Sequence, residues 1–215
     1  MTENKTHCVI FDCDGTLVDS ERLCCEAIRD TFNQYGAEMT IADAMEHFEG
    51  GKLADILSTT RERLNMAVSV DELEPVYREH LDRLFAEHLK PMTGAIELLE
   101  VLKRRGIEFC VASNGPKTKI ENALELTGLR SYFGDRIFSA FDTNSWKPDP
   151  DLVLYTAMAM GFRLEECIYV DDTPKGLEAG IKAGVKTVQL LGFSSKQPPE
   201  EVVQIKNLQE LESLL

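Results

Sequence analysis

Short apolar runs alternate with amphipathic segments along most of this 215-residue chain, and this alternation restricts the fold more than any other feature. Segments with helical periodicity separate most of the runs. Two of these segments, residues 116–126 and 174–183, begin with proline and are followed by glycine, which is the usual asymmetry of helix ends. Strands that alternate with helices predict βαβ units, and therefore an α/β fold with a parallel sheet covered on both faces. The apolar runs lie at residues 8–11, 107–112, 137–138, 167–170 and 185–191.

The segment between residues 20 and 88 interrupts this alternation. So many helical residues between the first strand and the rest of the sheet predict an inserted helical subdomain. We expect a core domain of residues 1–17 and 90–215, and a helical domain of residues 18–89. The tail at residues 207–215 is expected to form a short amphipathic helix after a loop at residues 197–199. The four helical patterns of the insert lie at residues 24–35, 41–48, 53–64 and 71–88.

The composition excludes several classes of protein. The formal net charge of −14 argues against a surface that binds nucleic acid or an anionic membrane. No apolar stretch approaches the roughly 18 residues of a membrane span, and the polar residues 1–6 contain no signal-peptide core. The six cysteines include no CxxC pair and lie mostly in apolar runs, which is typical of reduced core thiols. We therefore expect a cytoplasmic protein, monomeric or weakly dimeric, with no nucleic-acid or membrane partner.

Asp12 and Asp14 follow the first apolar run and are followed by Gly15. Side chains two residues apart on a strand point to the same side, so both carboxylates are expected to converge at the carboxyl end of that strand. Open α/β sheets bind their ligands at this edge. Two carboxylates held close together repel each other unless a cation lies between them or one is protonated. The pair therefore predicts a metal site, an acid–base couple, or both.

Three further polar motifs follow later strands and are expected at the same edge. Ser113 and Asn114 precede a helix, where a hydroxyl and backbone N–H groups form an anion site. Lys147 lies in a Trp-Lys-Pro-Asp-Pro turn, and Asp171 and Asp172 end the fourth apolar run. Carboxylates, a hydroxyl and an ammonium suit phosphoryl transfer, which depends on positioning and on neutralising charge. Oxygen ligands without His or Cys favour magnesium over zinc.

Each motif taken alone has a plainer interpretation. An Asp-x-Asp-Gly segment can be a tight turn or a calcium-type loop, although the later Glu of an EF-hand is missing. Residues 113–115 can be an ordinary loop, and Lys147 can be a solvated lysine. Asp171 with Asp172 can be an Asx turn or a helix cap. The order and spacing of all four motifs, rather than any one of them, indicate a catalytic site.

The four motifs together resemble those of the haloacid dehalogenase superfamily. The matching residues are 12–20, 113–114, 147–150 and 171–172, and the similarity extends from about residue 8 to residue 191. The resemblance implies a Rossmann-like core. The helical insert is similar to the four-helix cap of a subgroup that includes β-phosphoglucomutase and many sugar-phosphate phosphatases. The resemblance therefore implies a magnesium-dependent phosphatase that acts on a small phosphate ester, a sugar phosphate or a phosphosugar acid such as 6-phosphogluconate, through an aspartyl-phosphate.

The resemblance also implies a role for each carboxylate. Asp12 would be the nucleophile, and Asp14 the general acid and base. One Mg²⁺ would be bound by the side chain of Asp12, the backbone carbonyl of Asp14 and the side chain of Asp172. Asp171 would be a direct or water-bridged ligand of the same ion.

The substrate would be held by residues from the core and the cap. In the core, Ser113, the backbone N–H of Asn114 and Lys147 would bind the transferring oxygens. Thr16 is also expected to bind substrate, and together with the Gly15 turn it would fix the geometry of the loop after the nucleophile.

In the cap, the resemblance points to a loop that contains Gly50, Gly51 and Lys52. The glycines could supply flexibility or backbone contacts. Lys52 is the best candidate to bind a second anionic group of the substrate, such as a carboxylate. The alternative is that Lys52 is a solvated lysine at the start of a helix.

Other functions remain open within this superfamily. The main alternative is a phosphosugar mutase, but such mutases carry a Lys where this chain has Glu49 and a His where it has Cys24. A dehalogenase needs one Asp and no metal, which would leave Asp14 and Asp172 unused. A phosphonate hydrolase would need a Schiff-base lysine in the cap, for which Lys52 is a candidate. A non-catalytic binding module would not need the full set of chemical groups.

Overall fold

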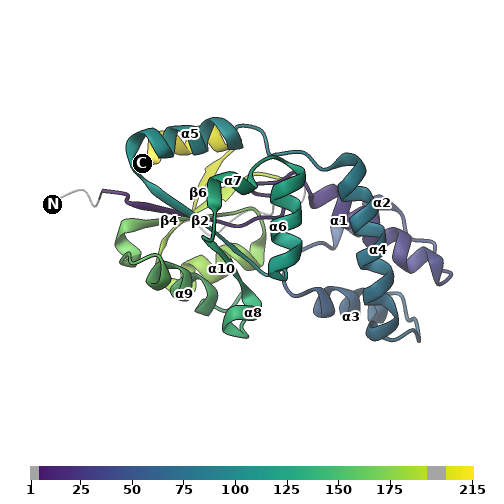
Figure 1. Ribbon diagram of the computed structural model, residues 1–215. Helices are drawn as coiled ribbons and strands as arrows, with labels where there is room; N and C mark the ends of the chain where they lie inside the picture. Colours follow the sequence, from purple (N-terminus) through teal and green to yellow (C-terminus); the bar gives the residue numbers. More distant parts are fainter. Residues whose placement is uncertain (1–4, 193–201) are drawn as a thin grey trace.

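The computed structural model describes residues 5–192 and 202–215 of the chain. In these residues, six strands form one sheet in the order β3-β2-β1-β4-β5-β6 (Figure 1), and every neighbouring pair is parallel. The predicted α/β fold with a parallel sheet is confirmed. The strands are β1 (Cys8–Phe11), β2 (Glu108–Ser113), β3 (Ile137–Ser139), β4 (Cys167–Asp171), β5 (Lys186–Leu190) and β6 (Val203–Ile205).

Strand β1 lies between β2 and β4, near the centre of the sheet. Its four side chains are all buried: Val9 and Phe11 belong to one hydrophobic core, and Cys8 and Ile10 to another. Because alternate side chains of a strand point to opposite faces, each face of the sheet has its own core. A strand covered on both faces must be apolar throughout, which explains the continuous run in the sequence. Asp12, the residue after Phe11, therefore lies near the middle of the carboxyl edge of the sheet.

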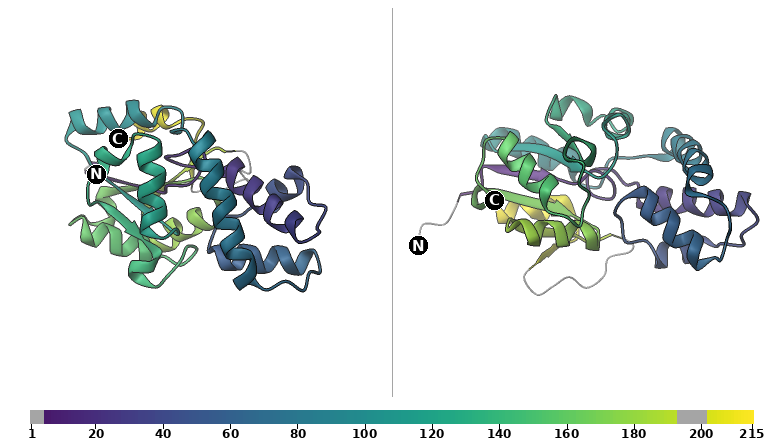
Figure 2. Two further views of the ribbon diagram at one scale, coloured as in Figure 1. Left: turned by 45° about the vertical axis from the view of Figure 1, so that its right-hand side comes forward. Right: turned by 90° about the horizontal axis from the view of Figure 1, so that it is seen from below.

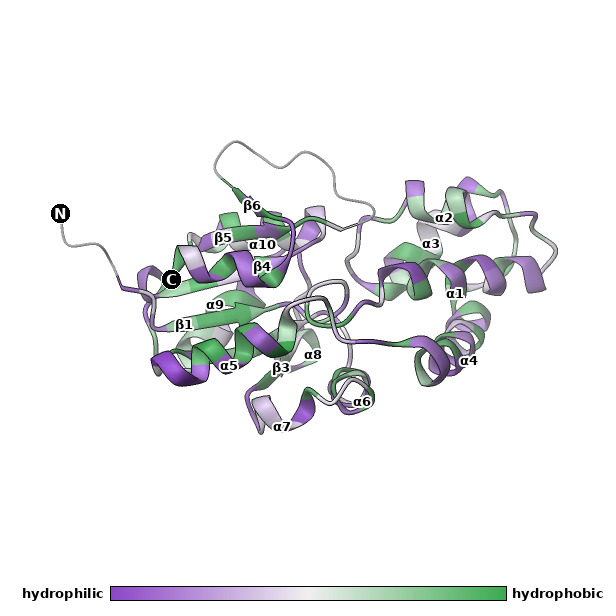
Figure 3. Ribbon diagram, turned by 90° about the horizontal axis from the view of Figure 1, so that it is seen from above, coloured by the Kyte–Doolittle hydropathy of each residue, from purple (hydrophilic) through white to green (hydrophobic). Residues whose placement is uncertain are grey.

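Helices cover both faces of the sheet. Helices α5 and α6 add buried leucines to the core that contains Phe11, and α9 and α10 pack into the core that contains Ile10. In Figure 3, mostly hydrophobic strands lie beside helices that have both hydrophobic and hydrophilic faces. All six cysteines are buried and none forms a disulfide. The helices of this part are α5 (Ala95–Arg105), α6 (Lys117–Leu126), α7 (Arg130–Phe133), α8 (Ala140–Thr143), α9 (Asp151–Ala159), α10 (Pro174–Ala183) and the 3₁₀ helices η1 (Leu164–Glu166) and η2 (Leu208–Leu214).

The helices between β1 and α5 form a separate group beside the sheet (Figures 1 and 2). Two of them begin with capping boxes, Thr40 with Asp43 and Ser69 with Glu72, which satisfy the first backbone N–H groups of each helix. Helix α1 packs along α4. It begins at Glu21, before the predicted start at residue 24, because the polar Glu21 and Arg22 add nothing to the apolar pattern. These helices are α1 (Glu21–Gln34), α2 (Ile41–Glu46), α3 (Leu53–Arg63) and α4 (Val70–His88).

Two chain segments connect this group to the sheet, and they pair with each other. Val18 and Pro91 form an isolated antiparallel bridge. The backbone N–H of Asp19 donates to the carbonyl of Lys90 over 2.9 Å, and the N–H of Met92 donates to the carbonyl of Leu17 over 2.9 Å. The insert therefore leaves and re-enters the core at one place.

The C-terminal part differs from the sequence expectation. Instead of an amphipathic α-helix, the chain forms the 3₁₀ helix η2, whose Leu208 and Leu211 are buried in the core beside α5. Strand β6 was not predicted, because it has three residues of which only Ile205 is buried. The predicted loop at residues 197–199 lies outside the described residues. In the part of the chain that the structure describes, no helix is long and apolar enough to cross a membrane.

Candidate active site

Polar residues from three neighbouring strands meet at the carboxyl edge of the sheet. Asp12 follows β1, Ser113 ends β2 and Asp171 ends β4. The backbone N–H of Asp12 donates to the carbonyl of Val170 over 2.9 Å, which continues the ladder between β1 and β4. A cavity of about 560 Å³ opens at this edge, and residues of α3, of α4 and of the loop before α3 also line it. The cavity therefore lies between the sheet and the helical insert.

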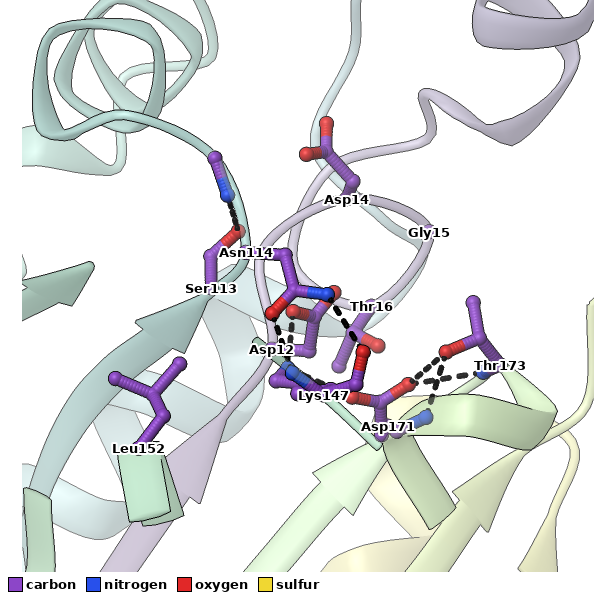
Figure 4. A network of polar contacts seen from close by, with 12 residues as sticks. Asp12, Asp14, Gly15, Thr16, Ser113, Asn114, Lys147, Leu152, Asp171 and Thr173 are labelled. Atoms are coloured by element: carbon purple, nitrogen blue, oxygen red, sulfur yellow. Dashed lines mark hydrogen bonds and ion pairs between the residues drawn. The ribbon is translucent and has the colours of Figure 1, made fainter. Parts of the chain in front are cut away.

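Lys147 lies against two of the carboxylates (Figure 4). Its Nζ donates to Oδ1 of Asp12 over 2.6 Å and to Oδ2 of Asp171 over 2.9 Å. The side chain of Asn114 fixes the backbone of Lys147: its Oδ1 accepts from the Lys147 N–H at 2.9 Å, and its Nδ2 donates to the Lys147 carbonyl at 3.3 Å. Burial alone would lower the pKa of Lys147, but Asp12 and Asp171 raise it above its ordinary value. The lysine therefore stays charged although its side chain is only 3% exposed.

Three buried carboxylates form a cluster, because Asp12, Asp171 and Asp172 have oxygen atoms within 4.8 Å of one another. Burial raises the pKa of Asp12 to about 7; Lys147 opposes this rise, and Asp171 adds to it. Burial and repulsion by Asp171 and Asp12 raise the pKa of Asp172 well above its ordinary value. A single ammonium does not neutralise three carboxylates, so the cluster fits a divalent cation. Its oxygen ligands suit Mg²⁺.

Hydrogen bonds from the loop after β4 fix Asp171. Its Oδ1 accepts from the backbone N–H of Thr173 at 2.9 Å and from the hydroxyl of the same residue at 2.8 Å. The hydroxyl of Tyr169 donates to Oδ2, the oxygen that also accepts from Lys147. Both oxygens of Asp171 are therefore held by protein donors, and Asp171 orients Lys147 toward Asp12.

Asp14 does not share the surroundings of Asp12. Oδ2 of Asp14 accepts from Nζ of Lys119 at 2.6 Å, and Oδ1 accepts from the hydroxyl of Ser20 at 3.0 Å. In Figure 4 its carboxylate points away from the carboxylate cluster. Both carboxylates line the cavity at the carboxyl end of β1, as expected, but they do not share one face of the strand, because β1 ends at Phe11 and Asp14 follows it outside the strand. Each of the two carboxylates has its own ammonium partner.

Thr16, which we predicted to bind substrate, contacts a carboxylate instead. Its side chain is fully buried and does not line the cavity. The hydroxyl of Thr16 donates to Oδ1 of Asp172 over 2.9 Å. Gly15, with φ of 78°, approaches the same carboxylate so closely that a Cβ would lie 2.2 Å from Oδ2 of Asp172. The turn after Asp12 therefore positions Asp172 rather than lining the cavity.

Ser113 and Asn114 both line the cavity, as expected of residues that hold an anion. The hydroxyl of Ser113 accepts from the backbone N–H of Gly115 at 3.3 Å, which leaves its own proton available to a ligand. From the sequence, a role could be assigned only to the backbone N–H of Asn114. The contact between the Asn114 side chain and Lys147 could not be predicted, because it joins residues 33 positions apart.

The cap loop reaches the cavity. Gly50, Gly51 and Lys52 all line it. A Cβ on Gly50 would lie 2.8 Å from Cγ2 of Thr173, and a Cβ on Gly51 would lie 2.8 Å from Cδ of Lys175, so the glycines let the loop touch the core. Their φ angles of 71° and 103° also favour glycine. Nζ of Lys52 lies 4.1 Å from the ring centroid of Trp146, a cation–π contact between cap and core.

Several side chains that line the cavity were not predicted from the sequence. Lys119 lies on α6, two residues after an exposed lysine, and nothing in the local pattern distinguishes one from the other. Tyr77 and Arg78 lie on α4, where helical periodicity alone does not show which side faces a cavity. Trp146 was noted only as part of the Lys147 motif.

Comparison with known proteins identifies similar sequences and folds. The model of the haloacid dehalogenase-like hydrolase family matches residues 9–190. The chain is 35% identical over 195 residues to the 6-phosphogluconate phosphatase of Escherichia coli, covering 91% of this chain and 87% of that protein. It is 30% identical to a phosphorylated carbohydrates phosphatase of Thermotoga maritima, covering 84% and 82%. A haloacid dehalogenase-like protein of unknown function from Agrobacterium tumefaciens has a TM-score of 0.81 and 25% identity, covering 97% of both chains.

Proposed function

Since this chain belongs to the haloacid dehalogenase-like hydrolases, we propose that it is a magnesium-dependent phosphoric monoester hydrolase. Its substrates would be small phosphorylated metabolites, either sugar phosphates or phosphosugar acids such as 6-phosphogluconate. The observation that carries this proposal is the contact of Asp12 with Lys147 and the Asp171–Asp172 carboxylates at one end of a cavity. The relatives that act on phosphorylated sugars support the substrate class. We propose a cytoplasmic enzyme, monomeric or weakly dimeric, whose cap is residues 18–89.

In the first step, a carboxylate oxygen of Asp12 attacks phosphorus. A bond forms between that oxygen and phosphorus, while the bond between phosphorus and the ester oxygen breaks. The ammonium of Lys147, the hydroxyl of Ser113 and the backbone N–H of Asn114 would bind the phosphoryl oxygens. These donors offset the negative charge that accumulates on the oxygens in the transition state.

Asp14 would move the protons of both steps. It would give a proton to the ester oxygen of the leaving alcohol, and then remove a proton from the attacking water. The water oxygen bonds to phosphorus, the bond between phosphorus and Asp12 breaks, and inorganic phosphate leaves. Because Asp14 is bonded to Lys119 and Ser20, it must turn away from them to reach the ester oxygen.

The carboxylate cluster would hold the Mg²⁺. We propose the side chains of Asp12 and Asp172 and the backbone carbonyl of Asp14 as ligands, with Asp171 direct or water-bridged. The bound ion would supply positive charge, so that an anionic nucleophile can approach an anionic phosphate. Thr16 would keep Asp172 in the orientation that binding requires.

A phosphosugar mutase is the alternative for the same site. Such an enzyme would need a bisphosphate to start turnover and would return isomerised sugar phosphate rather than inorganic phosphate. Cys24, which stands where mutases carry a His, lines the cavity. A thiol whose pKa is raised to about 12, chiefly by burial, is a poor proton carrier at neutral pH. We therefore place hydrolysis ahead of isomerisation.

The proposal is tested by a phosphate-release screen over sugar phosphates, phosphosugar acids and nucleotides, with and without Mg²⁺. We expect Mg²⁺-dependent release, fastest from a phosphosugar acid or a sugar phosphate. Isomerised product without phosphate release would favour the mutase. No release from any ester in the panel would overturn the proposal.

A further inference from the structure

Lys119 and Asp14 both line the cavity and contact each other there. Its ammonium is 2.6 Å from Oδ2 of Asp14, and its side chain is only 21% exposed. Nζ lies 5.6 Å from the ring centroid of Phe85, so one side of the ammonium faces an aromatic ring of α4. An ammonium has three donors, and Asp14 accepts one of them. Lys119 itself lines the cavity, so its remaining donors are available to a ligand there.

The other basic side chains that line the cavity are already engaged. Lys147 bonds Asp12 and Asp171. Nε and Nη2 of Arg78 both donate to Glu74 on the same helix, and Lys52 lies over Trp146. Among the basic residues of the cavity, Lys119 is the one that is bonded to the proposed general acid.

The position of Lys119 relative to the chemistry follows from the proposed mechanism. Asp14 must reach the ester oxygen, so the path of the leaving group passes beside Asp14. Lys119 touches Asp14 and therefore lies beside that path as well. As long as both oxygens of Asp14 are held by Lys119 and Ser20, the carboxylate faces away from Asp12. A ligand that takes the ammonium away from Asp14 removes one of these two restraints.

We propose that Lys119 recognises a carboxylate on the leaving group of the substrate, and that this contact frees Asp14 to turn toward the ester oxygen. The inference rests on the proposed phosphatase function and assigns its specificity for phosphosugar acids to one residue of the core. The substrate carboxylate replaces Asp14 as the counter-ion of Lys119, so the buried ammonium is never left unpaired. With an uncharged leaving group, Asp14 must break its bond to Lys119 without this exchange, so turnover is slower.

The test uses two substrates that differ at a single carbon. 6-Phosphogluconate carries a carboxylate where glucitol 6-phosphate carries a hydroxymethyl group, and the rest of the two molecules is the same. In the wild-type enzyme we expect kcat/KM for the acid to exceed that for the polyol by about tenfold or more, the value of one charge-assisted hydrogen bond. In Lys119→Met the ratio should fall to about one, chiefly through a higher KM for the acid.

Matched variants distinguish the proposed exchange of counter-ions at Lys119 from a general loss of activity. Lys117→Met removes an exposed lysine of the same helix that does not line the cavity, and it should keep the wild-type ratio. Lys119→Arg keeps the charge and should retain a preference for the acid. Lys119→Gln also removes the charge but keeps a hydrogen-bond donor, and it should give the same result as Lys119→Met. It takes the place of Lys119→Met if the methionine variant does not fold.

Three outcomes would overturn the inference while leaving the phosphatase proposal intact. The first is a wild-type enzyme that hydrolyses both substrates equally well. The second is a Lys119→Met variant that loses the same factor on both, which would limit Lys119 to supporting Asp14. The third is loss of the preference in Lys52→Met but not in Lys119→Met, which would place the carboxylate at the cap loop. Failure of the wild-type enzyme to release phosphate from either substrate would instead contradict the proposed function.

Discussion

At the scale of single residues, the site divides its carboxylates between two environments. Asp12 is buried with Asp171 and Asp172 beside the ammonium of Lys147, and this group retains an excess of negative charge. Asp14 lies outside the group and is balanced by Lys119. A nucleophile must stay ionised and fixed, whereas a general acid must move and exchange protons. The surroundings of Asp14 suit the role proposed for it, whereas Asp12, whose pKa burial raises to about 7, would need the bound cation to stay ionised.

Thr16 provides the first test at this scale, because its hydroxyl fixes Asp172. Thr16→Val keeps the volume of the side chain but removes the donor. We expect the Mg²⁺ concentration for half-maximal activity to rise by about tenfold to a hundredfold, the usual effect of losing a hydrogen bond to a metal ligand. The measurement is a magnesium titration of phosphate release.

Thr31→Val is the matched control. Thr31 is as fully buried as Thr16, but its hydroxyl donates to the carbonyl of Ala27 within α1. This variant should keep the wild-type magnesium requirement. An equal shift in both variants, or no shift in Thr16→Val, would show that Thr16 does not hold a metal ligand.

At the scale of elements, the hinge and the cap loop connect the insert to the chemistry. The paired segments at residues 17–19 and 90–92 are the place about which the insert would move if it opens and closes as a unit. The loop before α3 then touches Thr173, the residue whose backbone and hydroxyl hold Asp171. The loop is therefore connected to the carboxylate cluster through Thr173.

Gly50→Ala tests this contact. The added Cβ would lie 2.8 Å from Cγ2 of Thr173, closer than real Cβ atoms approach, so the loop cannot close without displacing Thr173. We expect kcat/KM for a sugar phosphate to fall by about tenfold or more. The midpoint of thermal unfolding should change no more than in the control variant.

Gly36→Ala is that control. Gly36 follows α1, has φ of 90° and would place its Cβ in open space. Both substitutions place a Cβ at a positive φ angle and so strain the backbone in the same way, but only the Cβ of Gly50→Ala would contact the core. Equal activity in the two variants would mean that contact between the loop and Thr173 is not needed for turnover.

Most elements could be predicted from the sequence, and the exceptions have physical reasons. The central strands are continuous apolar runs, and α10 begins with Pro174 and ends before Gly184. Nearby residues are therefore enough to predict where these elements lie. Strand β6 exposes two of its three side chains and is defined by pairing with β5, a partner that local periodicity does not show.

In the candidate site, too, residues at strand ends could be predicted, whereas contacts between distant parts of the chain could not. The motif residues Asp12, Ser113 and Lys147 could be assigned because the edge of a parallel sheet gathers them. The bonds from Lys119 to Asp14 and from Thr16 to Asp172 join residues 105 and 156 positions apart, and no local pattern specifies them.

At the scale of the whole molecule, the net charge of −14 opposes the approach of an anionic substrate. Four basic side chains line the cavity, those of Lys52, Arg78, Lys119 and Lys147, but six acidic ones line it as well, so a bound divalent cation would be needed to offset the field locally. Mobile ions screen the distant charges over about 10 Å, whereas the charges inside the cavity act at contact distance. An acidic protein can therefore bind a phosphate ester where its own ammonium groups and a divalent cation converge.

The charge of the cluster predicts how magnesium and pH act on stability. Burial and Asp171 raise the pKa of Asp12 to about 7, from an ordinary value of 3.8. Without metal, the folded protein therefore binds more protons than the unfolded chain between these values, and it loses stability as the pH rises through about 7. Mg²⁺ replaces the proton as counter-charge, so it should raise the melting temperature more at about pH 8 than at about pH 5. At a hundredfold excess over Kd the gain is about 2.7 kcal/mol.

Thermal unfolding with and without Mg²⁺ at the two pH values measures this effect. Asp172→Asn removes one carboxylate of the cluster and should reduce the stabilisation by magnesium at the higher pH. A magnesium effect that is the same at both pH values would contradict the account of the cluster as a cation site.

The central claim is that Asp12 attacks phosphorus, and the most direct measurement is the rate of Mg²⁺-dependent phosphate release by Asp12→Asn. The substitution keeps the size of the side chain and removes the nucleophilic carboxylate. We expect turnover to fall by at least about a thousandfold, while the melting temperature without metal is maintained. Turnover within about tenfold of the wild-type rate in a folded Asp12→Asn enzyme would contradict the claim.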